Sequence, residues 1–204
     1  HLRIKEVSPQ DYLTKQFSEA VYCRLDPWHY TKHKNNEIHD LQHFIDNPHE
    51  YEANFLPFAL KSDIYISCHF WDPRSPEFLK PEDYLHPDFK ISIIGDVSCD
   101  IKKPIASTLR ASKIADPIYG YNPKTQLEDE PFKRGNITVM AIDNLPAELP
   151  RSSSADFANA FYHKILPELL KGDDSKVIER ATILKNGKLT PRFEYLRDYL
   201  EGRE

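Results

Sequence analysis

Four short apolar runs are separated along the chain by segments of helical or polar character. They lie at residues 2–7, 63–68, 90–96 and 137–142, and they are rich in isoleucine and valine. Runs of this length with β-branched side chains are typical of buried strands in a parallel sheet. Because helical patterns separate the runs, the sequence predicts an α/β fold, a Rossmann-like parallel sheet with flanking helices.

The helical segments are marked by their start signals and apolar spacing. Ser8 followed by Pro9 is typical of a helix start, so we expect a helix from Pro9 to about residue 17. Further helices are expected at 38–46, 49–60 and 81–85. Two charged or polar stretches are expected to be loops, and a short strand is expected at 118–119. The loops are residues 32–37 and 124–134.

The last quarter of the chain has a different pattern. Apolar residues at helical spacing follow Ser152–Ser154, which we expect to cap a long helix that Pro167 kinks or divides. Asn186-Gly187 between apolar residues predicts a hairpin, and Pro191 opens a final helix. We therefore divide the chain into residues 1–150 and a C-terminal helix, hairpin and helix at 151–204.

Two of the predicted strands end in acidic and small side chains. Asp96, Ser98 and Asp100 follow one strand, and Asp143 and Asn144 follow another. Ligands of open α/β sheets bind beyond the carboxyl ends of the strands. These residues are therefore candidates for the rim of a cofactor and substrate crevice. The alternative is that the carboxylates only cap the turns that follow the strands.

Composition excludes several classes of partner. The 204 residues carry a net charge of −5, with lysine and arginine scattered, so a nucleic-acid partner is not expected. No apolar run approaches the roughly 20 residues of a membrane helix, so no membrane partner is expected. The chain has only three cysteines, which favours a reducing compartment, and we expect the cytoplasm.

Histidines are concentrated in one early segment: His29, His33, His39 and His43. His39 and His43 are four residues apart, a spacing found in zinc ligands. On a helix over 38–46, the apolar stripe from Ile38 to Ile45 lies nearly opposite this pair. We therefore expect the histidines on a solvated face, and no metal site.

Three blocks of sequence carry a family resemblance. They are Asp96-Val-Ser-Cys-Asp100, Ile142-Asp-Asn-Leu-Pro-Ala-Glu-Leu-Pro-Arg151, and the pair Lys5-Glu6-Val7-Ser8 and Asn186-Gly-Lys-Leu-Thr190. Together they resemble the C-terminal half of saccharopine dehydrogenase and of the related lysine–2-oxoglutarate reductase. The similarity covers essentially the whole chain, and the second block is the most specific.

The resemblance implies an oxidoreductase that uses NAD or NADP and interconverts saccharopine with lysine and 2-oxoglutarate. By position, residues 1–150 would be the dinucleotide-binding domain, and Glu6 would approach the adenosine ribose. The residues that would bind the cofactor are Glu6, Phe70, Val97, Ile142, Asp143, Asn144 and Leu145. The residues that would face a small amino-acid substrate are Ser98, Cys99 and Asp100.

The chain also departs from this family. It has no glycine-rich phosphate loop, so the first β-α unit of the fold is expected to be missing. The family's acid–base lysine and histidine belong to an N-terminal half, so no catalytic residue is assigned here. We expect a fragment that needs that half, against which residues 151–204 would pack, and that is inactive alone.

Two other functions fit the same residues. One is an amino-acid dehydrogenase resembling alanine dehydrogenase, and the other is a non-catalytic nucleotide-binding or oligomerisation module. The sequence leaves the oligomeric state open.

Overall fold

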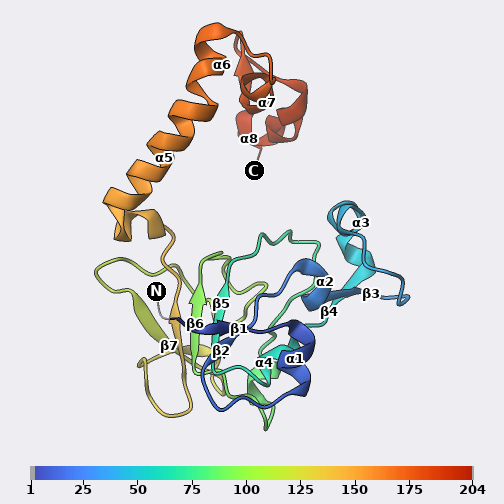
Figure 1. Cartoon of the computed structure of the whole chain (residues 1–204), viewed down its shortest axis with the longest axis vertical. Coiled ribbons are helices and arrows are strands. Elements are labelled where there is room, and N and C mark those ends of the chain that lie inside the picture. Colours follow the sequence, from blue (N-terminus) through green and yellow to red (C-terminus); the bar gives the residue numbers. More distant parts are fainter. Residues whose placement is uncertain (1–2, 204) are drawn as a thin grey trace. The chain divides into compact units, whose positions relative to one another are not determined.

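The chain forms two compact units. The computed structural model describes residues 3–203 (Figure 1), so Leu2 of the first predicted strand lies outside the described residues. One unit ends at Leu145 and the other begins at Pro146.

A five-stranded mixed sheet organises the first unit. Its order is β5 (Ile64–Ser67), β6 (Ile93–Asp96), β9 (Ile137–Met140), β7 (Ile118–Asn122) and β8 (Leu127–Asp129). The strands β5, β6 and β9 are parallel neighbours, whereas β7 and β8 are antiparallel. The predicted parallel sheet is therefore confirmed only for three strands.

A tight hairpin explains why β8 runs antiparallel to β7. Asn122 ends β7, and its side-chain oxygen accepts a hydrogen bond from the backbone N–H of Lys124 at 3.0 Å. Gln126, with φ of 57°, closes the loop before β8. A loop this short can join only antiparallel strands. The expected charged loop at 124–134 thus contains a strand, and its charged side chains suit a strand at the sheet edge.

The sheet has one buried and one partly exposed face in this unit. Ile94 and Val139 are fully buried, and Tyr119 and Tyr121 lie beside them in the hydrophobic core. Phenylalanine and leucine side chains from the intervening segments complete this core: Phe55, Phe58, Phe78 and Leu79. Side chains at alternate positions, Ile64, Ile66 and Ile93, are 58%, 66% and 37% exposed.

The start of the chain forms a small separate sheet. The strand β1 (Lys5–Glu6) pairs in parallel with β2 (Val21–Tyr22) and takes no part in the five-stranded sheet. The helix α1 (Pro9–Thr14) begins as predicted, because the Ser8 hydroxyl accepts the backbone N–H of Asp11 at 3.1 Å. It ends earlier than expected.

The segment from 27 to 59 differs most from expectation. Here α2 (Pro27–Tyr30), β3 (Thr31–His33) and α3 (Leu41–Asp46) are followed by a 3₁₀ turn, η1 (Pro48–Glu50), and by β4 (Tyr51–Ala53). The strands β3 and β4 pair antiparallel, so neither the polar loop at 32–37 nor the helix at 49–60 was fully right. Only α4 (Leu56–Ala59) is helical near the end of the latter.

The exposed face of α3 was assigned wrongly from the sequence. Ile38 is 96% exposed and precedes the helix, which Asp40 caps by accepting the backbone N–H of His43 at 2.7 Å. Ile45 is 54% exposed. The helix instead turns His43 toward the buried ring of Tyr51, with 5.9 Å between ring centroids. The aromatic ring and hydroxyl of Tyr51 explain why the His43 side chain, which stays 43% exposed, lies over it in place of an isoleucine.

The second unit is described by itself. Its elements are η3 (Leu145–Glu148, beginning in the first unit), α5 (Pro150–Lys164), α6 (Leu166–Lys171), α7 (Val177–Ala181), β10 (Leu184–Lys185), β11 (Lys188–Leu189), η4 (Pro191–Leu196) and α8 (Arg197–Leu200). Ser152–Ser154 lie inside α5 rather than capping it, because Pro150 occupies its first turn.

Other sequence signals in this unit are confirmed. The long helix breaks at Ile165, two residues before Pro167, as expected. The predicted hairpin joins β10 to β11 through Asn186 and Gly187, whose φ values of 53° and 75° suit the mirror-image turn. The last predicted helix begins as the 3₁₀ helix η4.

In the first unit, the expected helix at 81–85 is a short 3₁₀ helix, η2 (Asp83–Leu85).

The helices described over residues 3–203 include none that combines the length and the apolar character needed to cross a bilayer.

Gly120 is required where β7 passes β8. A Cβ atom at this position would collide with the backbone of Asp129 and Glu130. We expect Gly120→Ala to lower the free energy of unfolding by at least about 2 kcal/mol, as measured by urea denaturation. Gly95→Ala in β6 is the control, because its Cβ would meet only side-chain atoms at ordinary contact distance, Met140 at 3.8 Å and Ile66 at 3.9 Å. Equal effects of the two substitutions would contradict the close approach.

Candidate functional site

Three neighbouring parallel strands end along the same edge of the sheet. The last residues of β5 and β6, Ser67 and Asp96, are paired, and Gly95 pairs with Met140 at the end of β9. The segments that follow these strands therefore leave the sheet side by side. They carry Phe70, residues 97–100 and residues 142–145, which are the predicted site positions of this unit apart from Glu6.

Asp96 is buried and holds the turn after β6 together. It is 1% exposed, and one carboxylate oxygen accepts the backbone N–H groups of Ser98 at 3.0 Å and Cys99 at 3.2 Å. The other oxygen accepts the Thr108 hydroxyl at 2.7 Å. Each of these hydrogen bonds contributes more to stability than a hydrogen bond between two neutral groups, because the acceptor is charged. For Asp96 the turn-capping alternative is therefore the one that the structure supports.

Cys99 lies within a ring of carboxylates. Its backbone has a φ of 56°, and its thiol donates to the Asp96 carbonyl oxygen at 3.2 Å. Burial, and after it the nearby charges of Asp96, Asp143 and Asp100 in that order of importance, together raise the pKa of the Cys99 thiol to about 11. Because thiolate is the reactive form, this cysteine is a poor nucleophile at neutral pH.

Asp143 and Asp100 come from segments that follow different strands, and both lie near enough to Cys99 for their charges to act on its thiol. Asp143 follows β9 and is exposed, whereas Asp100 follows β6 and is half-buried. Burial raises the pKa of the Asp100 carboxyl, and the charge of Asp96 adds to the effect. The surface at the carboxyl ends of these strands is consequently acidic, which suits the binding of a hydrogen-bond donor or an amine.

A hydrogen-bonded ring joins β5 to the turn after β6. The Ser98 hydroxyl donates to the backbone carbonyl oxygen of His69 at 2.9 Å and lies 2.9 Å from the Ser67 hydroxyl. The Ser67 hydroxyl lies 2.9 Å from Nε2 of His69. With the Ser98 proton used, Ser67 donates to Ser98, and His69 donates from Nε2 to Ser67. This order places the neutral Nε2–H tautomer on His69.

His69 is a structural partner of this turn that the sequence reasoning missed. Burial lowers the pKa of its imidazole, partly offset by the charge of Asp96, and its ring meets Phe78 edge-on with 4.8 Å between centroids. Ser67 and His69 are two residues apart at a strand end, so they share one side of the strand. That spacing was the available signal.

The predicted cofactor residues differ in accessibility. Phe70 is 92% exposed and Val97 is 42% exposed, and Asp143 and Asn144 are also exposed. Ile142 is 3% exposed, so it offers the edge only its backbone. The remaining two positions, Leu145 and Glu6, are half-buried and exposed respectively.

Glu6 lies on the separate sheet of β1 and β2. Its carboxylate accepts the Tyr22 hydroxyl at 2.9 Å, and this hydrogen bond is the main reason that the pKa of Tyr22 is raised. Because Glu6 lies on β1, it does not belong to the segments that follow β5, β6 and β9.

No family model matches the chain. It is 24% identical over 200 residues to the alpha-aminoadipic semialdehyde synthase of Arabidopsis thaliana, across 94% of this chain and 19% of that protein. It is 25% identical over 228 aligned residues to the mitochondrial alpha-aminoadipic semialdehyde synthase of Mus musculus, across 98% and 24%. It is 31% identical over 135 residues to the saccharopine dehydrogenase [NAD(+), L-lysine-forming] of Neurospora crassa, across 63% and 33%.

The chain's homologues are alpha-aminoadipic semialdehyde synthases and saccharopine dehydrogenases. The resemblance drawn from the three sequence blocks is therefore confirmed. The chain spans 19% and 24% of the length of the two synthases and 33% of the dehydrogenase.

The buried carboxylate of Asp96 should contribute strongly to the stability of this saccharopine dehydrogenase homologue. Asp96→Ala leaves two backbone N–H groups without their acceptor, so we expect the free energy of unfolding to fall by about 3 kcal/mol. Asp96→Asn keeps an acceptor oxygen for both N–H groups and should cost about 1 kcal/mol. Guanidinium denaturation of both variants measures the difference. Equal stability of the wild type and Asp96→Ala would contradict the role of the carboxylate.

The environment of Cys99 should show in the pH dependence of its alkylation. Because the pKa of Cys99 is raised to about 11, we expect its rate of reaction with iodoacetamide to keep rising with pH beyond 10. Asp143→Asn removes one of the raising charges and should speed the reaction at pH 9. Mass spectrometry of the labelled peptides measures each site, and the exposed Cys68 serves as the internal reference. A Cys99 rate that levels off near pH 8 would contradict this environment.

Proposed function

We propose that this chain is part of an NAD- or NADP-dependent oxidoreductase of lysine metabolism that interconverts saccharopine with lysine and 2-oxoglutarate. The observation that carries the proposal is the convergence of the segments after β5, β6 and β9 on one sheet edge. The names of the relatives, semialdehyde synthase and L-lysine-forming saccharopine dehydrogenase, support the class of reaction.

The accessible side chains at this edge fit a nicotinamide ring. Phe70 and Val97 expose apolar surface on which a flat ring can lie, since both belong to segments that leave neighbouring strands. Asn144 and Asp143 can exchange hydrogen bonds with a carboxamide. The bound nicotinamide would supply the hydride acceptor or donor. The protein's own part is to orient the ring and to exclude water from one of its faces.

The substrate would approach the turn after β6. Ser98 and Cys99 are held in place by Asp96 and by the ring with Ser67, so their positions are fixed before binding. The acidic side chain of Asp100 can accept hydrogen bonds from a substrate amine. Such preorganised polar groups favour one orientation of the substrate.

Glu6 is the proposed contact for the adenosine ribose. A carboxylate accepts hydrogen bonds from the ribose hydroxyls and repels a 2′-phosphate. Glu6 is already accepting from the Tyr22 hydroxyl, so binding would exchange or share that hydrogen bond. We propose either NAD or NADP as the cofactor, and a comparison of the activity with NAD⁺ and with NADP⁺ decides between them.

The 204-residue chain alone is proposed to be inactive. It contains no G-x-G-x-x-G sequence, which in dinucleotide folds binds the pyrophosphate at a helix N-terminus. No acid–base residue is assigned to the strand-end segments, and the chain covers a minor part of its relatives. We also propose a reducing compartment, because Cys23, Cys68 and Cys99 are free thiols.

The test is an assay of a full-length protein that contains this chain. We expect saccharopine to reduce NAD⁺ or NADP⁺, measured by the absorbance of the reduced nicotinamide, and alanine to give no turnover. Asp143→Ala should raise the KM for the cofactor about tenfold, a loss of about 1.4 kcal/mol. His163→Ala, in the exposed part of α5, is the matched control. Turnover of alanine alone would overturn the proposed substrate.

A further inference from the structure

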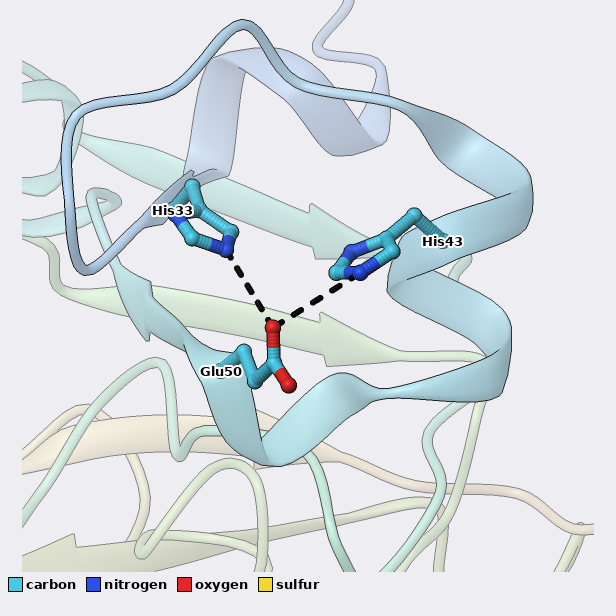
Figure 2. Close-up of side chains that lie close together, drawn as sticks. All are labelled: His33, His43 and Glu50. Atoms are coloured by element: carbon cyan, nitrogen blue, oxygen red, sulfur yellow. Dashed lines mark hydrogen bonds and ion pairs between the residues drawn. The ribbon is translucent and has the colours of Figure 1, made fainter.

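His33, His43 and Glu50 form a cluster that the strand-end segments do not involve. They come from β3, α3 and η1 respectively, and Figure 2 shows the two imidazole rings facing one carboxylate oxygen of Glu50. Nε2 of His33 lies 3.4 Å from that oxygen, and Nε2 of His43 lies 3.6 Å from it. One possible ligand atom from each residue lies within 4.8 Å of the other two.

The two distances from the imidazoles to Glu50 match the edges of a metal coordination shell. Zinc lies about 2.0–2.2 Å from imidazole nitrogen and carboxylate oxygen, so two ligands of a tetrahedral ion are about 3.3 to 3.5 Å apart. The two measured distances to Glu50 are 3.4 and 3.6 Å. We propose that His33, His43 and Glu50 bind one divalent transition-metal cation of the zinc class.

The ring of His43 is held in the tautomer that a metal ligand needs. The Tyr51 hydroxyl donates its hydrogen to the carbonyl oxygen of Asp40 at 3.2 Å, and it lies 3.2 Å from Nδ1 of His43. Since that hydrogen is already used, Nδ1 of His43 must donate to Tyr51, which leaves a lone pair on Nε2. Metal-ligating histidines are oriented by the same kind of outer hydrogen bond.

His33 supplies a buried and fixed ligand. It is 4% exposed, and its ring meets that of Tyr51 edge-on with 5.1 Å between centroids. Its Nδ1 accepts the backbone N–H of Asn35 at 3.2 Å. Binding a cation at Nε2 moves the ring proton to Nδ1, so this contact with Asn35 must open. The change costs one weak hydrogen bond and gives the site a specific signature at the Asn35 amide.

The surroundings leave room for further ligands. A depression of about 470 Å³ adjoins the cluster and is lined by His33, His43 and Tyr51 and by the acidic side chains of Glu37 and Asp46. Water or one of these carboxylates can complete the shell there. Two imidazoles and one carboxylate favour zinc, cobalt or nickel over magnesium and calcium, which prefer oxygen ligands alone.

The experiment uses the whole chain after dialysis against a chelator. Titration calorimetry with zinc chloride is expected to show one ion bound per chain, and magnesium chloride is expected to show none. His43→Ala and Glu50→Gln should each weaken zinc binding more than about 100-fold, since each removes a ligand. Tyr51→Phe keeps the ring but removes the partner of His43, so a loss of about 10- to 100-fold is expected.

Control variants separate this site from adventitious binding. His49→Ala removes an exposed histidine that lies 3.8 Å from the other oxygen of Glu50, and His163→Ala removes one from α5. Both should bind zinc as the wild type does. Circular dichroism checks that each variant is folded, and ¹⁵N NMR should show the Asn35 amide shifting at one equivalent of zinc.

The outcomes decide the question without reference to dehydrogenase activity. Absence of saturable zinc binding would overturn the proposal, as would binding that survives in both His43→Ala and Glu50→Gln. If His43 binds no metal and instead titrates as an imidazolium paired with Glu50, the cluster is an ion-pair network and the proposal fails.

Discussion

The carboxylate of Asp96 is the interaction on which the candidate site depends. It is buried at the end of a central strand, where an unpaired charge would be costly, and three donors from the segments that follow compensate it. In doing so it fixes the direction of the chain from Ser98 to Asp100. The side chains that could meet a substrate are therefore positioned by a residue that itself is out of reach of solvent.

Parallel pairing then extends this order to neighbouring segments. Because β5, β6 and β9 run in the same direction, everything after Ser67, Asp96 and Met140 departs from one edge. The ring formed by Ser67, Ser98 and His69 links the first two of these segments directly. The segments after β5 and β6 are thus one connected polar structure and not two independent loops.

The sequence predicted the parts of the fold that local pattern decides. The three parallel strands, the start of α1 at Ser8, the break near Pro167 and the hairpin at Asn186-Gly187 all carry short-range signals. The antiparallel strand β8 was missed because an edge strand tolerates charged side chains, so its pattern resembles a loop.

The histidine segment was misjudged for a different physical reason. A stripe of apolar residues predicts a buried face only when a hydrophobic surface is there to receive it, and the receiving surface here is the polar-tipped ring of Tyr51. That residue lies on β4, which was expected to be helical, so its position could not be anticipated. Of the candidate site, the strand-end segments were foreseen from sequence, whereas the support from Ser67 and His69 depends on the pairing of β5 with β6.

The place of β5 at the border of the sheet has a practical consequence. Within residues 3–203, no strand pairs with the outer backbone groups of β5, and Ile64 and Ile66 expose apolar surface next to these groups. A border of this kind is a template for intermolecular strand addition. The backbone of β5 is therefore the part of this sheet at which a strand of another molecule could be added, and its two exposed isoleucines would lie next to that strand.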